Sequence, residues 1–185
     1  ELKRATNSIN FYSITELDTL GKKLNFDIDY LSYNSDTDNN FNSNSFYPNN
    51  TPIPNRYSSA NNSSNQNIGI LTSKLDFEYP TKFANLSFGT KLTFINNNSQ
   101  VNFFNTTTGN YTFDQTKSNV FNYKEEIQAL YFSGSKKLAK KLEMKLGLRG
   151  ENTRTNGFSQ TLNQTNKNNY FKLFPTFYLN YVIND

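Results

Sequence analysis

The dominant pattern along this chain is an alternation of apolar and polar residues with a period of two. In the stretch KLEMKLGLRGE, residues 141–151, the alternating aliphatic positions are Leu142, Met144, Leu146 and Leu148. Successive side chains of a β-strand point to opposite faces, so this stretch predicts a strand with one aliphatic face and one largely charged face. The aliphatic face could meet either a protein core or lipid.

The same pattern returns along most of the chain, and helical periodicity almost never competes with it. It predicts strands at residues 23–30, 71–79, 85–94, 121–132, 141–151 and 170–183, with a weaker strand near Thr6 to Leu17. In the stretch 121–132 the apolar face is assigned to Phe121, Tyr123, Ile127, Ala129 and Tyr131, and Glu125 interrupts it. The fold class that follows is all-β, with about seven strands.

The connections between these strands alternate between short and long. Short turns are expected at residues 17–23, 80–82 and 134–141, and long loops rich in Asn, Ser and Thr near residues 34–66, 95–119 and 153–168. Long structureless loops are uncommon in compact domains. Because they fall at every second connection, they would all emerge on one side of an antiparallel up-and-down meander. This is the plan of a transmembrane β-barrel.

Strand length and aromatic placement favour lipid as the partner of the apolar face. Each strand offers about ten alternating residues, which is the length that crosses a bilayer core. Aromatic residues gather at both strand ends, as in the interfacial belts of membrane barrels. The expected belts are Tyr79, Phe83, Tyr131 and Tyr181 near the short turns, and Tyr30, Phe94, Phe121, Tyr123 and Phe171 near the long loops. A soluble all-β carbohydrate-binding or adhesion module remains the alternative.

Composition narrows the functional classes further. The mean hydropathy is −0.75 although 16% of the residues are aromatic, so polar and apolar residues must be segregated along the chain or between faces. The chain has no His and no Cys, which removes the usual zinc, haem and iron–sulfur ligands and excludes thiol or imidazole catalysis. The net charge of +4 is spread out, and no basic cluster predicts nucleic-acid binding. Apolar runs reach only about four residues, so no transmembrane helix is expected.

Few residues resemble a chemical site. Asp36 to Asn40 has the oxygen spacing that opens a calcium loop, but Phe41 stands where an EF-hand requires Gly. Four carboxylates on predicted strands are expected to form polar networks with Lys74 and Lys91 rather than a catalytic pair, namely Asp27, Asp29, Asp76 and Glu78. Pro175 within a strand indicates a bulge or a local edge. The Asn-x-Ser/Thr matches at Asn61 and Asn85 carry no weight in an Asn-rich chain. No catalytic, metal or cofactor residue is predicted, an enzyme is not expected, and the ligand-binding residues stay unknown.

Several segments resemble the outer-membrane β-barrel family of TonB-dependent receptor-like proteins. The resemblance rests on LDTLGKKLNFDIDYLSY (17–33), NYKEEIQALYFSGSKKL (122–138), LGLRGENT (146–153) and YFKLFPTFYLNYVIND (170–185). It implies ligand uptake across the outer membrane of a gram-negative bacterium, with a plug domain and the TonB system as partners in the full-length protein. Outer-membrane lipid and an unknown ligand at the long loops are the other implied partners.

The chain also departs from that family's complete pattern. We find no plug domain or energy-coupling box in these residues, and the chain stops at Asn184 and Asp185 without a terminal aromatic. An odd number of strands is unusual for a single-chain bacterial barrel. Residues 1–185 are therefore expected to form one partial barrel domain whose apolar face and open edges would make the isolated segment self-associate.

Overall fold

The computed structural model describes residues 1–183, and every regular element in that range is a β-strand. The strands are β1 (Leu2–Glu16), β2 (Lys23–Ser43), β3 (Ser58–Pro80), β4 (Asn85–Asn105), β5 (Thr112–Phe113), β6 (Asn119–Ala139), β7 (Leu142–Ser159) and β8 (Gln164–Tyr181). No helix suited to crossing a membrane occurs among these residues. The predicted chain end at Asn184 and Asp185 lies outside the described residues.

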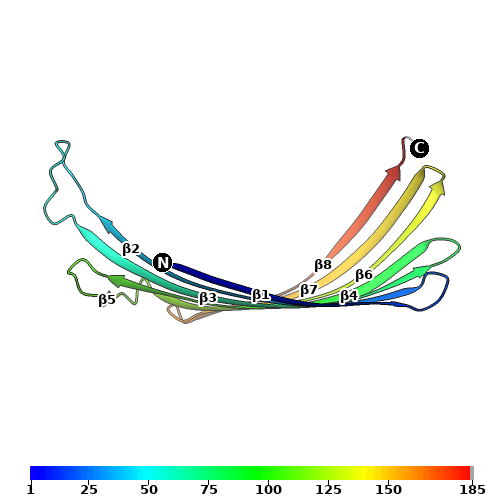
Figure 1. Ribbon diagram of the computed structural model, residues 1–185, viewed down its shortest axis with the longest axis horizontal. Helices are drawn as coiled ribbons and strands as arrows, with labels where there is room; N and C mark the ends of the chain where they lie inside the picture. The colour runs from blue at the N-terminus through cyan, green and yellow to red at the C-terminus, as the bar shows by residue number, and fades with distance from the viewer. Residues whose placement is uncertain (184–185) are drawn as a thin grey trace.

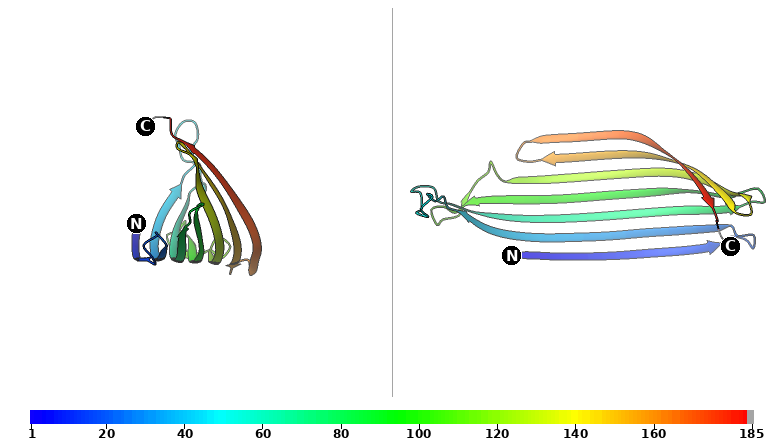
Figure 2. Two further views of the ribbon diagram at one scale, coloured as in Figure 1. Left: turned by 90° about the vertical axis from the view of Figure 1, so that its right-hand side faces the viewer. Right: turned by 90° about the horizontal axis from the view of Figure 1, so that it is seen from above.

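Seven long strands form one antiparallel sheet in the order β1-β2-β3-β4-β6-β7-β8, and the short β5 pairs with β4. Each long strand therefore lies beside its chain neighbour, as Figure 2 shows from above. Within the described residues β1 and β8 do not pair with each other, so the sheet is an open, bent trough (Figure 1). The predicted all-β meander of about seven strands is confirmed.

The predicted long loops are wrong over much of their length, because the strands continue into them. Residues 34–43, 58–66, 95–105, 153–159 and 164–168 are all strand, and the connections shrink to 44–57, 106–118 and 160–163. Polar side chains sustain these extensions by bonding across strands. The Asn61 amide, for example, donates to Asp38 at 2.5 Å and to Asn40 at 2.9 Å. Low hydrophobicity therefore did not indicate irregular structure here.

The short turns lie at residues 17–22, 81–84 and 140–141. The last is tighter than predicted, because β6 continues to Ala139 with an irregular register after Lys137. In the first turn, Asp18 Oδ1 accepts the backbone N–H groups of Leu20 and Lys22, while Lys22 Nζ lies 3.1 Å from Asp18 Oδ2. The backbone hydrogen bond from Lys22 is the largest cause that lowers the pKa of Asp18.

The sheet has almost no core of its own. Among the described residues only Ala60 and Ala129 are buried apolar residues. The accessible surface is 13431 Å², whereas a compact monomer of this mass would expose roughly 9,000 Å². The apolar side chains must therefore be covered by something outside this segment.

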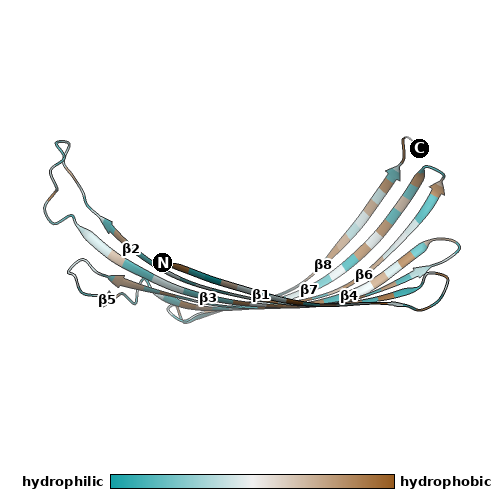
Figure 3. Cartoon of the chain, viewed as in Figure 1, coloured by the Kyte–Doolittle hydropathy of each residue, from teal (hydrophilic) through white to brown (hydrophobic). Residues whose placement is uncertain are grey.

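One face of the sheet carries a continuous apolar belt near the short turns. Because directly paired residues share a face, the strand register identifies its members. They include Phe11, Phe26, Leu75, Phe77, Phe88, Leu92, Leu130, Phe132, Leu146, Leu148, Leu173 and Phe177. Many are open to solvent, with Leu130 71% and Phe177 63% exposed. Figure 3 shows the alternation of hydropathy along the strands.

The belt ends at a row that joins Ile9, Tyr30, Leu71 and Phe94 on β1 to β4. Beyond this row, toward the connections 44–57 and 106–118, the same face becomes polar with residues such as Asn34, Asn67 and Asn98. Strands β2, β3 and β4 are 21, 23 and 21 residues long, whereas about 9–11 residues cross a bilayer core. Roughly half of each strand therefore extends past the belt.

The predicted facing of β6 is wrong. The register pairs Tyr131 with Gly89 and Arg149, which lie on the polar face, so Phe121, Tyr123, Ile127 and Ala129 belong to the polar face as well. Lys124, Glu126 and Gln128 lie on the face of the belt, with Leu130 and Phe132.

The predicted belts therefore lose Phe121, Tyr123 and Tyr131, while Tyr79, Tyr181, Tyr30, Phe94 and Phe171 lie on the belt face. Glu125 no longer interrupts an apolar face, and it accepts a hydrogen bond from Tyr123 at 2.9 Å.

Candidate functional site: the concave polar face

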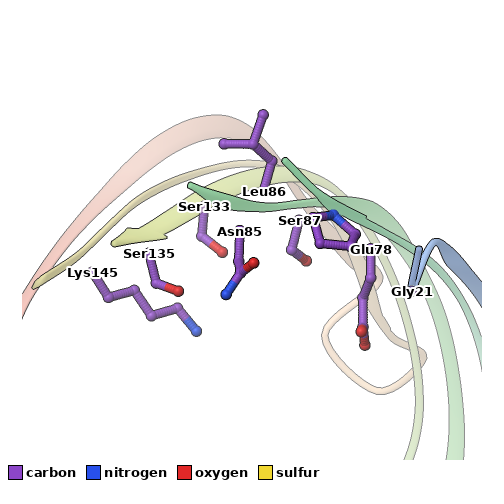
Figure 4. Close-up of a pocket in the computed structure, with 9 residues that line it drawn as sticks. Gly21, Glu78, Asn85, Leu86, Ser87, Ser133, Ser135 and Lys145 are labelled. Carbon is purple, nitrogen blue, oxygen red and sulfur yellow. The ribbon is translucent and has the colours of Figure 1, made fainter. Parts of the chain in front are cut away.

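The polar face of the sheet is its concave face. Figure 4 shows Asn85, Ser87, Ser133 and Ser135 pointing beneath the arch of the strands, while Leu86 points the opposite way, and Glu78 and Lys145 complete the concave group. These residues line a hollow of about 470 Å³ close to the turns at residues 17–22 and 81–84. Hydroxyl, amide, ammonium and carboxylate groups are thus presented together to the interior of the trough.

A hydrogen bond between Tyr131 and Asp76 lies at the centre of this face. The Tyr131 hydroxyl on β6 donates to Asp76 Oδ1 on β3 at 2.5 Å, although β4 lies between the two strands. The β4 residue in the same row is Gly89, which pairs with both Asp76 and Tyr131. A Cβ atom at Gly89 would lie 2.6 Å from Asp76 Oδ1 and 2.8 Å from the Tyr131 ring. The absence of a side chain at Gly89 therefore permits the bond.

Charged groups extend this contact along the row. Lys74 Nζ lies 2.5 Å from Asp76 Oδ2, so both Asp76 oxygens have a partner. On the other side, the Arg149 guanidinium lies 5.4 Å from the centre of the Tyr131 ring, and its Nε donates to Glu151. The result is a connected polar group on β3, β6 and β7, which we call the wall cluster: Lys74, Asp76, Tyr131, Arg149 and Glu151.

The predicted carboxylate networks are confirmed only in part. Asp27 and Asp29 both accept hydrogen bonds from Asn10, at 3.0 and 2.6 Å, and Glu78 accepts one from Asn25 at 3.2 Å. Lys74 joins Asp76 as expected. Lys91 lies directly opposite Lys74 and has no ion-pair partner within residues 1–183.

The remaining predicted positions are structural. Asp36 and Asp38 lie in β2 and accept amide hydrogen bonds from Asn65 and Asn61, each at 2.5 Å. Pro175 lies opposite Leu148 in a regular register on β8, an outermost strand of the described sheet, so it marks a local edge and no bulge. In the described part of the chain, no group of three or more His, Cys, Asp or Glu residues could hold a metal ion.

Sequence reasoning missed most of the wall cluster. Tyr131 had been placed on the apolar face, and the roles of Gly89, Arg149 and Glu151 depend on which residues lie in one row. The pattern R-x-E at 149–151 indicated charges on one face of β7, but only the register brings them beside Tyr131.

The connections at the far end of the sheet are tied to one another. Thr107 Oγ1 donates to Ser59 O at 3.2 Å, and the Phe41 and Phe103 rings lie 6.0 Å apart. The connection 160–163 is linked to the connection 106–118 through Thr161, whose hydroxyl donates to Ser118 O at 2.6 Å. These contacts lie at the bases of the connections, where the strands end.

An antiparallel meander with a polar concave face and an apolar convex belt is the wall of a transmembrane β-barrel. Residues 15–185 match the outer membrane protein beta-barrel family, and the chain therefore belongs to this family. It is accordingly a protein of the outer membrane. No curated protein sequence matches the chain.

The solved structures with a similar sheet include two outer-membrane proteins. One is the ferric citrate transporter FecA in its unliganded form, with 12% identity and a TM-score of 0.64; the match covers 100% of this chain and 26% of FecA. The other is the ferric yersiniabactin uptake receptor FyuA from Yersinia pestis, with 12% identity and a TM-score of 0.63, covering 100% of this chain and 27% of FyuA. The likeness shows a shared fold, and the chain spans about a quarter of the length of either protein.

Proposed function

We propose that this chain is part of the barrel wall of an outer-membrane transporter that takes up a ligand with the help of a plug domain and the TonB system. The observation that carries the proposal is the concave face, where charged and hydroxyl side chains line a wall that curves without closing on itself. The similarity to a transporter and an uptake receptor supports it. We propose no enzymatic activity for this wall.

The concave face is suited to hold a polar domain in place. Asp76 and Glu151 already have cationic partners, so neither carboxylate needs a further counter-charge from a polar domain that packs against the wall. Lys91 has no such partner in the described chain and can receive a carboxylate or a carbonyl from a plug. The rim at the connections 44–57 and 106–118 is the place proposed for first contact with ligand.

Residues 1–185 contain no cysteine, so a thiol introduced there can report on the plug once any cysteine elsewhere in the full-length protein has been replaced by serine. A single Ser133→Cys substitution in the full-length protein places a thiol on the concave face, and Leu146→Cys places one on the convex belt as the matched control. We expect a water-soluble maleimide to label Ser133→Cys slowly, and deletion of the domain that precedes the barrel to speed this labelling at least tenfold. Labelling at equal rates with and without that domain would contradict a plug.

Uptake itself is tested in cells. A strain that lacks the full-length gene should lose uptake of at least one nutrient under limiting supply, and loss of the TonB system should reproduce the defect. Complementation by the wild-type gene serves as the control. Uptake that requires this gene but continues at the same rate in a strain without TonB would argue for passive diffusion through the barrel instead.

Membership of an outer-membrane family supports the first of the two functions considered from the sequence. The belt with Leu130 and Phe177 exposed is explained by lipid, so a soluble carbohydrate-binding or adhesion module is not needed to account for it.

A further inference from the structure

A group of cations lies on the convex face at the outer end of the apolar belt. Lys124 on β6, Arg154 on β7 and Lys167 on β8 share this face, and we call them the outer cationic cluster. The register places Lys124, Asn156 and Lys167 in one row, and Arg154 in the adjacent row with Glu126 and Asn169. Neighbouring strands are about 4.8 Å apart, so the three backbone positions lie within roughly 10 Å of one another.

The cluster is confined to one part of the sheet. On β2 to β4 the row of Lys124 carries Ser32, Gly69 and Asn96, and the row of Arg154 carries Tyr30, Leu71 and Phe94. On this face the nearest cation of β1 is Lys3, which already pairs with Glu1 at 3.1 Å. A nonspecific attraction to the membrane surface would not require the cations to be gathered on three adjacent strands.

The three cations are available for a ligand. All are exposed, and none has an ion-pair partner in the described chain, although Glu126 lies directly opposite Arg154 in the register. Lys124, Arg154 and Lys167 together line a hollow of about 480 Å³, to which Glu126, Asn156 and Asn169 also contribute. Arginine and lysine around such a hollow suit a phosphate group, which Arg binds through two parallel hydrogen bonds.

A second hollow adds the apolar half of a binding site. It has a volume of about 370 Å³ and is lined by Tyr30, Leu71 and Phe94 from the last row of the belt, together with Lys124 and Glu126. Gly69 also borders this hollow. A Cβ atom built at Gly69 would have only the Tyr30 hydroxyl within 4.0 Å, so the space beside it is open. Cationic and apolar hollows therefore meet at Lys124, so the ligand that fits both is amphipathic.

We infer that the outer cationic cluster binds the phosphorylated headgroup of the outer-leaflet glycolipid, whose acyl chains cover the adjoining belt. The longer connections of a barrel face outward, so the cluster lies at the level of the outer-leaflet headgroups. Long Lys and Arg side chains can reach a phosphate while their stems stay on the apolar surface. The inference does not depend on which ligand the protein transports.

The test compares two triple variants of the full-length protein purified in detergent. Lys124→Gln/Arg154→Gln/Lys167→Gln removes the cluster, and Lys82→Gln/Lys137→Gln/Lys140→Gln removes the same charge at the opposite end of the strands. The probes are the purified phosphorylated glycolipid, the same glycolipid after phosphatase treatment, and phosphatidylglycerol. Circular dichroism and heat-modifiable gel migration confirm folding, and the single variants Lys124→Gln and Lys167→Gln replace a triple variant that does not fold.

We expect the cluster variant to bind the phosphorylated glycolipid between about tenfold and a hundredfold more weakly than wild type, since each lost cation near a charged lipid surface weakens binding several-fold. The control variant should bind like wild type, and removal of the phosphates should weaken wild-type binding to the level of the cluster variant. Equal binding by both triple variants would overturn the site. Equal binding of phosphatidylglycerol and the glycolipid would overturn the identity of the ligand.

Discussion

The Tyr131 hydroxyl reaches Asp76 at 2.5 Å across an intervening strand, passing over Gly89. The contact joins β6 to β3 on the concave face, across the β4 strand that lies between them. It depends on one backbone position without a side chain. Several properties of the protein depend on this and on similarly local relationships.

We expect Gly89→Ala to destabilise the barrel by about 1–3 kcal/mol, the usual cost of forcing atoms into a packed site. The new methyl group would lie 2.6 Å from the Leu75 carbonyl oxygen, which cannot move aside, and would displace Tyr131 from Asp76. The matched control is Gly69→Ala, because the nearest atom there is 4.0 Å away. Thermal unfolding in detergent measures both, and an equal melting temperature for the two variants would show that the crossing of Tyr131 is unimportant.

The facing of β6 predicts opposite effects for two arginine substitutions. Leu130 lies in the middle row of the apolar belt, so Leu130→Arg should cost ~2–4 kcal/mol and reduce assembly in the membrane. Ser133→Arg places the same side chain on the concave face and should assemble almost normally. The fraction of heat-modifiable, membrane-inserted protein is the readout. If Ser133→Arg were the more damaging change, the original interpretation of this strand would be right.

A pH effect is expected in the turn at residues 17–22. Backbone hydrogen bonds hold the pKa of Asp18 below its ordinary value. At pH values above that ordinary pKa, the carboxylate therefore stabilises the folded turn. This contribution is lost as the pH falls through the lowered pKa. Wild type should therefore be more stable than Asp18→Ala at neutral pH, and the two melting temperatures should converge in strong acid. A difference that grows on acidification would have the wrong sign.

Hydrogen exchange can test the extension of the strands past the belt. Amides in 34–43 and 58–66 are paired in β2 and β3, so they should exchange slowly, whereas the connection 44–57 should exchange within the earliest time points. Mass spectrometry of the protein in detergent resolves these peptides. Rapid exchange throughout residues 34–66 would restore the long loop that the sequence suggested.

The isolated segment should not remain a monomer without detergent. Its β1 and β8 edges have unpaired backbone groups in the described sheet, and its belt exposes Leu130 and Phe177. We expect oligomers or aggregates in light scattering, and dispersal on addition of detergent. A monodisperse monomer in plain buffer would mean that the belt is covered in some other way.

Period-two alternation was sufficient to predict the strands and the meander, because Leu142 to Leu148 and similar stretches have no competing helical pattern. It failed on β6, where Phe121, Tyr123 and Ile127 imitate an apolar face although the register assigns them to the concave side. The face on which a residue lies is set by the register of its strand within the whole sheet. It cannot be read from one strand that carries aromatic residues on its polar side. The wall cluster was hidden for the same reason, since Gly89 carries no chemical signal in a single sequence.

Asparagine-rich stretches were also misread, because polarity was taken as evidence of loops. Asn61 and Asn65 instead bond to Asp38 and Asp36 across the strand pair. Above a membrane both faces of a wall meet water, so a strand there has no apolar face to display. Periodicity of hydrophobicity cannot detect such strands, whereas the positive φ values at Asn50, Asn55 and Asn163 show where asparagine does make turns.

The strands that continue past the belt change what the outside world can attack. Proteases cut flexible segments that can enter their active sites, and a hydrogen-bonded strand cannot do so. Protease treatment of intact cells should therefore cleave only within the connections 44–57 and 106–118, and leave the polar strand extensions beneath them intact. Antibodies and phages that bind this protein would likewise contact rigid strands rich in asparagine side chains, with flexible segments only in the connections at the strand ends.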